Sequence, residues 1–182
     1  MKSRLTTAFV TAILVGIGVG RMSAQESPEN PLDKLSWLVG GKWVADIKSP
    51  KGEQLTVETT MEWTGHKKAL KYAVVFQSKE GAAPQYEGMY WWNPAKKGIS
   101  LLQIDRVGNV TEALVTIEGD KWTQQNTLTR LDGTKQEQRA QFVRENEDTF
   151  AFKAFIPKGA EWVEAVGFKY RRVRDGASGK RP

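Results

Sequence analysis

Residues 55–63, Leu-Thr-Val-Glu-Thr-Thr-Met-Glu-Trp, alternate mainly apolar side chains with polar ones at every step. A period of two is typical of a β-strand that buries one of its faces. Residues 70–76 repeat the pattern after a polar turn at Gly65 and His66. A short turn forces its flanking strands to run in opposite directions, so the two stretches predict an antiparallel pair.

The same pattern continues through the rest of the chain. Turn signals recur about every dozen residues, and no segment after Gly41 has the spacing of a helix. About ten strands in sequence must either close on themselves or expose two unpaired edges. We therefore expect an all-β fold, an antiparallel up-and-down β-barrel of about ten strands. A flat β-sandwich is the alternative.

The N-terminal residues differ from this pattern. Lys2 and Arg4 precede an uncharged apolar run at residues 8–20, which is shorter than the roughly 20 residues that a bilayer span needs. Ala24 then offers a small residue for cleavage. We expect residues 1–24 to be a signal peptide, with the mature protein starting near Gln25 and lying in the periplasm or outside the cell. An uncleaved N-terminal anchor is the alternative.

Composition excludes several kinds of site. The chain of 182 residues has no cysteine, so no disulfide, reactive thiol or thiolate metal site can form. A single histidine, His66, cannot build a multi-histidine metal centre. The net charge of +6 falls to +3 without residues 1–24, which hold three basic residues and no acidic one. We expect no metal, no cofactor, no nucleic-acid partner and no membrane span after signal cleavage.

Turn lengths predict which side chains face inward. Two-residue turns at 108–109, 119–120, 132–133 and 146–147 would set neighbouring strands in register, and cross-strand partners share a face. The resulting inner face carries apolar side chains at Leu102, Ile104, Val115, Ile117, Trp122, Val143, Phe150 and Phe152. It also carries a polar group made up of Arg106, Gln124, Asn126, Arg139 and Gln141.

The last strand has two possible registers. A two-residue turn at 158–159 would turn Val163, Ala165 and Lys169 inward. A three-residue turn with a bulge would instead turn Trp162, Glu164, Val166 and Phe168 inward. The second register buries more apolar surface. It also places Glu164 near Arg139, where a buried charge needs a partner. We therefore prefer the second register.

Both ends of the barrel segment carry recognisable motifs. Apolar residues at 32, 35, 38 and 39 precede Gly40-Gly41, which predicts a helix of at most two turns. Gly41-Lys42-Trp43 follows at once, and Tyr170-Arg171-Arg172 ends the last strand.

These motifs, with the aromatic run at residues 86–94, resemble lipocalin-like (calycin-type) bacterial envelope domains of unknown function. The resemblance covers roughly residues 32–172 of the sequence. It implies a barrel plugged by the helix, a ligand cavity, and a contact of Trp43 with Arg171 or Arg172. The expected organisation is a linker at 25–31, the barrel at 32–173 and a basic flexible tail at 174–182.

The inward polar group is the candidate ligand site. Arginine suits a carboxylate or a phosphate, and an aromatic ring suits an apolar body. We expect an exported protein that binds a small amphipathic or anionic molecule, and no catalytic residue is assigned. The expected ligand-binding residues are Arg106, Gln124, Asn126, Arg139, Gln141, Glu164 and Tyr90.

Two alternatives stay open at this point. One is an enzyme of modest chemistry, an isomerase or a hydrolase, that uses Arg139 and Glu164 inside the barrel. The other is a structural envelope protein whose barrel is filled with side chains. The sequence names neither the ligand nor the oligomeric state.

Overall fold

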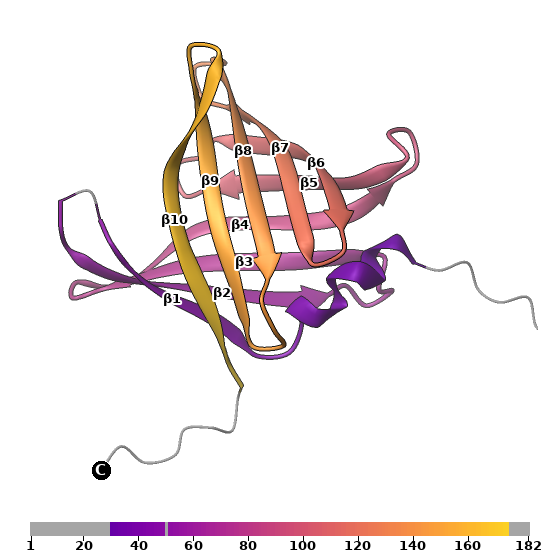
Figure 1. Ribbon diagram of the computed structural model, residues 1–182, viewed down its shortest axis with the longest axis horizontal. Helices are drawn as coiled ribbons and strands as arrows, with labels where there is room; N and C mark the ends of the chain where they lie inside the picture. Colours follow the sequence, from indigo (N-terminus) through magenta and orange to yellow (C-terminus); the bar gives the residue numbers. More distant parts are fainter. Residues whose placement is uncertain (1–29, 50, 175–182) are drawn as a thin grey trace, which may run out of the picture.

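Ten antiparallel strands form one closed barrel in a computed structural model that describes residues 30–49 and 51–174 (Figure 1). Each strand pairs with its neighbours in the sequence, and β1 closes the ring against β10. The strands are β1 (Lys42–Lys48), β2 (Gln54–Trp63), β3 (Ala69–Ser78), β4 (Gly81–Asn93), β5 (Gly98–Asp105), β6 (Val110–Glu118), β7 (Lys121–Thr129), β8 (Lys135–Arg144), β9 (Thr149–Lys158) and β10 (Glu161–Val173). The predicted up-and-down barrel is therefore confirmed, and the sandwich alternative is wrong.

The described part of the chain leaves some predicted segments untested. The signal peptide, most of the linker and the tail from residue 175 onward lie outside the described residues. Within residues 30–49 and 51–174, no helix has the length and apolar character needed to cross a membrane.

One short helix, η1 (Pro31–Leu38), precedes the barrel and covers one of its ends (Figure 1). It is a 3-10 helix, whose three residues per turn set Leu32, Leu35 and Leu38 on one side, and all three are buried. Asn30 caps its start, because the Asn30 side chain accepts a hydrogen bond from the Leu32 amide. The predicted helix is confirmed, and its leucines form the base of the core.

Trp43 and Arg172 seal this closed end. The Trp43 ring is fully buried, its Nε1 donates to the Leu38 carbonyl at 2.8 Å, and its edge contacts the Phe150 ring at 4.8 Å between centroids. The Arg172 guanidinium lies 4.3 Å over the same ring and donates hydrogen bonds to the carbonyls of Trp37, Val39 and Gly40. The contact predicted between Trp43 and a terminal arginine is confirmed, and Arg172 makes it.

The turn between β6 and β7 has the predicted length. Gly119-Asp120 joins strands in which Ile117 pairs with Trp122 and Ala113 pairs with Asn126. These partners share the inner face, where Trp122 and Asn126 are both buried.

The turn before β8 is longer than predicted, and this reverses the faces of β8. Arg130 N donates to Thr134 O at 2.9 Å, so the loop has three residues with Gly133 last, at φ +80. Asn126 consequently pairs with Gln138 rather than with Arg139. A shift of one residue moves every side chain of a strand to the other face. The inward placement of Arg139, Gln141 and Val143 is therefore wrong, and all three lie on the outer surface.

The loop between β5 and β6 departs from the prediction in the same way. Asp105 N donates to Asn109 O at 3.0 Å around a three-residue loop that ends at Gly108, with φ +95. Leu101 pairs with Ala113, so β5 turns Leu101 and Gln103 inward. The inward placement of Leu102, Ile104 and Arg106 is wrong, because the first two face outward and Arg106 lies exposed in the loop.

The last strand combines parts of both expected registers. A two-residue turn at 159–160 sets Val163 opposite Ile156, and a bulge at Ala165 then shifts the register. Val166 and Phe168 face inward beyond the bulge, as the preferred register predicted. Trp162 and Glu164 face outward, so their predicted places inside the barrel are wrong. The Glu164 carboxylate pairs with Lys153 at 2.7 Å.

Candidate functional site

Inward side chains near the turn between β9 and β10 are exposed to solvent. At the closed end Trp43 and Phe150 are almost fully buried, whereas Val166 and Ile156, which also face inward, are 41% and 36% exposed. An inward side chain that solvent reaches lies beside open space. The barrel is therefore open at the end opposite η1, where the turns at 79–80, 106–109, 130–134 and 159–160 lie, and we call this end the mouth.

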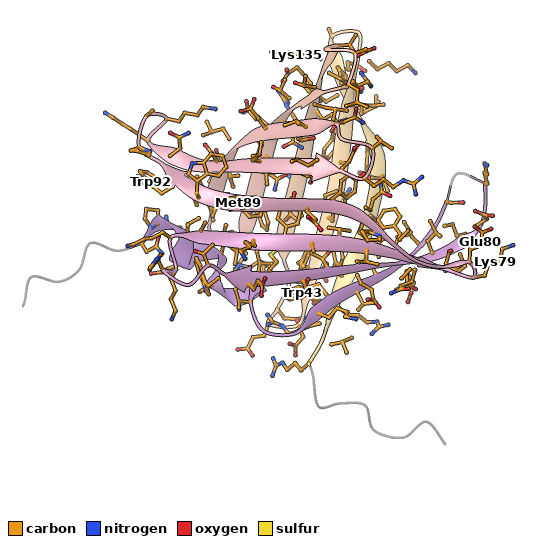
Figure 2. All side chains as sticks on the ribbon, turned by 180° about the vertical axis from the view of Figure 1, so that it is seen from behind. Trp43, Lys79, Glu80, Met89, Trp92 and Lys135 are labelled. Atoms are coloured by element: carbon orange, nitrogen blue, oxygen red, sulfur yellow. The ribbon has the colours of Figure 1, made fainter. Side chains whose placement is uncertain are left out.

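Figure 2 shows two of the tips that surround the mouth. The turn at Lys79 and Glu80 and the start of β8 at Lys135 project away from η1. Aromatic side chains line the interior below these tips. Phe76 lies 6.4 Å from Tyr86, and Phe152 lies 5.0 Å from Phe168, between ring centroids.

All four tyrosines of the chain face the interior. The Tyr72 and Tyr90 rings lie 5.4 Å apart, and the Tyr72 hydroxyl donates to the Gln103 side chain. Gln124 Nε2 donates to the Tyr90 hydroxyl at 2.8 Å, and this bond joins β7 to β4 across the barrel. The other two phenols are Tyr86 and Tyr170, and the Tyr170 hydroxyl accepts a hydrogen bond from Thr59.

Gly88 makes room for the Tyr72 ring. A Cβ atom on Gly88 would lie 2.7 Å from Tyr72 Cε1 and 2.5 Å from the Leu102 carbonyl oxygen, both closer than van der Waals contact allows. Glycine therefore lets the ring cross β4 and reach Gln103 on β5.

Burial keeps these phenols neutral. Desolvation raises the pKa of Tyr72, Tyr86 and Tyr90, and it raises the pKa of Tyr170 to about 12 against the opposing effect of the hydrogen bond with Thr59. Neighbouring tyrosines raise the pKa of Tyr72 further. At neutral pH the four hydroxyls consequently act as uncharged hydrogen-bonding groups.

These shifts predict a loss of stability in alkali. Unfolded tyrosines ionise near pH 10, whereas Tyr170 in the folded state ionises at about 12. The free energy of unfolding is therefore at its full value below pH 10 and falls as the pH rises through 12. Tyr170 alone accounts for about 2–3 kcal/mol of this fall. We expect tyrosinate absorbance to rise together with loss of the β-sheet circular dichroism signal. Ionisation of all four tyrosines near pH 10 in a folded barrel would contradict their burial.

The middle of the barrel also contains amide side chains. Gln103, Gln124, Asn126 and Gln138 face inward from β5, β7 and β8. Asn126 is 9% exposed, and its Oδ1 is sealed from solvent without a hydrogen bond from any described residue. With the phenols, these amides form a polar, uncharged lining.

Inward charges lie only at the two ends of the barrel within the described residues. Asp105, at the mouth, is held by its own loop, because its carboxylate accepts from Asn109 and from the Val107 amide. Burial would raise the pKa of Asp105, but these hydrogen bonds outweigh it and lower that pKa. Arg172 and Arg144 lie at the closed end over the rings of Trp43 and Trp37, and Lys158 and Glu161 flank the outermost turn of β9 and β10.

The structure brings together three of the seven predicted site residues. Tyr90, Gln124 and Asn126 face the interior, and the first two are hydrogen bonded to each other. The others, Arg106, Arg139, Gln141 and Glu164, are at the outer surface or in a loop. The sequence prediction did not assign Tyr72, Tyr86, Gln103, Gln138 or Tyr170 to the site. The period-two pattern around Leu70 already pointed Tyr72 inward, but Gln103 and Gln138 required the correct loop lengths.

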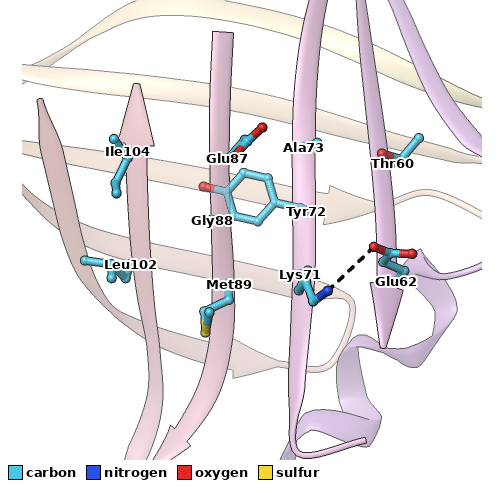
Figure 3. Close-up of a pocket in the computed structure, with 10 residues that line it drawn as sticks. All are labelled: Thr60, Glu62, Lys71, Tyr72, Ala73, Glu87, Gly88, Met89, Leu102 and Ile104. Atoms are coloured by element: carbon cyan, nitrogen blue, oxygen red, sulfur yellow. Dashed lines mark ion pairs between the residues drawn. The ribbon is translucent and has the colours of Figure 1, made fainter. Parts of the chain in front are cut away.

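Two hollows lie on the outer surface. One, of about 390 Å³, lies over β2–β5, where Met89, Leu102 and Ile104 are flanked by Lys71 and Glu62, whose charged groups are 4.0 Å apart (Figure 3).

The other hollow, of about 420 Å³, lies over β7–β10. In it the Arg139 guanidinium covers the Trp162 ring at 4.0 Å, beside Phe155. Across the described ranges, no three acidic or histidine side chains gather where they would hold a metal ion.

Comparison with known proteins adds little to this geometry. No protein-family model and no curated protein matches the chain. Among solved structures, a de novo designed fluorescence-activating β-barrel is similar at 12% identity, covering 75% of this chain and 94% of its own, with a TM-score of 0.36. EF1p2_mFAP2b bound to DFHBI is similar at 11% identity, covering 76% and 96%, with a TM-score of 0.37. The barrel assignment stands on the strand pairing itself.

Proposed function

We propose that this protein is an exported carrier of a small amphipathic molecule, held in the open half of the barrel. One observation carries the proposal: Val166 and Ile156 face inward near the mouth and are exposed to solvent, beyond a buried, uncharged layer of tyrosines and amides. Small-molecule sites are typically concave and mostly apolar, with a few placed polar groups. A barrel packed only for stability would have no need of inward valine and isoleucine side chains that are exposed to solvent.

The lining offers two kinds of contact at two depths. Near the mouth the rings of Phe76, Phe152 and Phe168 present apolar surface for the body of a ligand. Deeper in, the hydrogen bond between Gln124 and Tyr90 crosses the barrel and forms a floor. Polar groups above this floor would orient the polar end of the ligand.

Lipocalin-like membership and export belong to the same proposal. Support comes from the plug helix, from Gly41-Lys42-Trp43 at the start of β1, and from Arg172 over the Trp43 ring. The charged start and apolar run of residues 1–24 support export. N-terminal sequencing of the cellular protein tests this part, and a mature chain that retains Met1 in the cytoplasm would refute it.

The geometry does not favour the enzyme alternative. Arg139 and Glu164 were its expected pair, and both side chains lie on the outer face, where Glu164 pairs with Lys153. The other alternative, a structural protein whose barrel is filled with side chains, is tested by the binding experiment below.

The test compares two valines of similar exposure on opposite faces. Val166 faces the mouth interior at 41% exposure, and Val143 faces outward at 36%. We expect the wild type and Val143→Trp to bind Nile red, an uncharged amphipathic dye, with an increase in its fluorescence. Val166→Trp should weaken binding by about tenfold or more, because the indole occupies the entrance.

Melting curves of both variants give the control for folding. Equal dye affinity in Val166→Trp and Val143→Trp would place the dye outside the barrel. No binding to the wild type by Nile red or by a fluorescent fatty acid would favour the filled structural barrel.

A further inference from the structure

We infer that the ligand is an uncharged hydrogen-bond donor, a hydroxyl or N–H compound, and that it donates to the Asn126 side chain. This inference rests on the proposed function and names the chemical class of molecule for the same site. It replaces the anionic head group expected from the sequence.

Asn126 lies directly above the floor of the open half. Its neighbour on the inner face of β7 is Gln124, about 6–7 Å away along the strand, which is bound to Tyr90. Asn126 is therefore the first polar side chain of β7 that a molecule entering from the mouth would meet above this hydrogen bond.

The Asn126 carbonyl oxygen has an unused acceptor site. More than nine-tenths of the residue is buried, and among the described residues none donates to Oδ1. Leaving a buried acceptor unpaired costs about 1–3 kcal/mol, so such a group in a binding site favours a ligand that donates to it.

The two strands beside Asn126 carry side chains of different size on their inner faces. Asn126 pairs with Ala113 on the β6 side and with Gln138 on the β8 side, while Ala140 lies diagonally across from it and pairs in turn with Ala154. The methyl side chain of Ala113 consequently leaves more room beside Asn126 on the β6 side than the longer Gln138 leaves on the β8 side.

The charge distribution argues against an ionised ligand. The arginines that were to hold an anion, Arg106 and Arg139, lie outside the interior, and Arg172 is engaged over Trp43 at the closed end. Burying a carboxylate without a cationic partner costs several kcal/mol, so a carboxylate would be excluded from the middle of the barrel.

Three probes with one aromatic body separate these possibilities. Naphthol carries a hydroxyl donor, methoxynaphthalene has the same oxygen without the donor, and naphthoate carries a carboxylate. Calorimetric titration at neutral pH should show naphthol binding about tenfold more tightly than methoxynaphthalene, with naphthoate the weakest. Asn126→Leu should bind naphthol and methoxynaphthalene with affinities within about twofold of each other.

Gln125→Leu is the matched control, because Gln125 is adjacent in sequence and exposed on the outer face. It should keep the wild-type order of affinities. Equal binding of naphthol and methoxynaphthalene to the wild type, tightest binding of naphthoate, or unchanged discrimination in Asn126→Leu would each overturn the inference and leave the proposed function standing. If neither Nile red, the fluorescent fatty acid nor any of the three probes binds, the proposed function fails and the inference fails with it.

Discussion

Replacing Trp43 by alanine is expected to destabilise the barrel by about 3–5 kcal/mol, which is a large part of the roughly 5–15 kcal/mol that holds a typical domain together. The indole is fully buried between η1 and Phe150, and its loss would leave a cavity under Arg172. The Leu38 carbonyl would also lose its hydrogen bond from the ring. Thermal melting followed by circular dichroism measures the effect.

The control for this variant is His66→Ala. His66 is exposed in the turn between β2 and β3, so its removal should change the melting temperature little. Equal melting temperatures for the two variants would show that Trp43 does not stabilise the closed end of the barrel.

Arg172→Met is expected to cost about 3–5 kcal/mol. Arg172 donates to the Val39 carbonyl at 3.0 Å and to the Gly40 carbonyl at 2.8 Å, and bonds from a charged donor contribute about 1.5–3 kcal/mol each. Methionine keeps most of the side-chain volume, so the loss reports the guanidinium contacts, including about 0.5–2 kcal/mol from the Trp43 ring. Urea denaturation with an unchanged slope would give the difference in stability.

The neighbouring Arg171→Met is a closely matched control. Arg171 faces outward, and its charged group lies 3.8 Å from Asp46 in an exposed ion pair. Exposed pairs contribute about 0–1 kcal/mol, so this variant should remain close to the wild type. If Arg171→Met and Arg172→Met lowered the free energy of unfolding equally, the cause would be the loss of one positive charge and not the loss of the Arg172 contacts with Trp43 and the carbonyls.

The strand pattern was predictable because it depends only on local alternation. Leu55, Val57 and Met61 occupy one face by parity alone, and the closed barrel followed from the number of strands. The same holds for the Gly119-Asp120 turn, whose two residues set Gln124 and Asn126 inward.

Loop length was the weak point. The predictions treated Asp132-Gly133 and Gly108-Asn109 as two-residue turns, whereas both loops have three residues and end in a glycine with positive φ. Three-residue hairpin loops of this kind are common, and the glycine occupies the left-handed position. One residue in each loop sufficed to exchange the faces of β8 and β5.

In β9, a second error of one residue in loop length cancelled the error made in β8. The loop after β8 also has three residues, because Glu145 N donates to Thr149 O at 3.0 Å. The face of β9 was thereby restored, and Phe150 and Phe152 point inward as predicted although every pairing with β8 is shifted. Correct burial of a strand therefore does not prove its register.

The contacts across the barrel were beyond prediction from local pattern. Gln124 and Tyr90 lie on β7 and β4, and no turn connects these strands directly. Such a bond depends on the diameter and tilt of the whole barrel, which pairwise hairpin geometry does not fix. The polar floor therefore became visible only with the structure.

The seal at Trp43 also sets an order of events during synthesis. Arg172 contacts Val39, which lies 133 positions earlier in the chain and therefore leaves the ribosome well before it. Until β10 exists, β1 lacks one of its two neighbours and the oxygens of Val39 and Gly40 lack their donor. Contacts of such long range form late and slowly. β10 therefore closes the barrel, and a nascent chain that ends before β10 could not pair β1 on both of its sides.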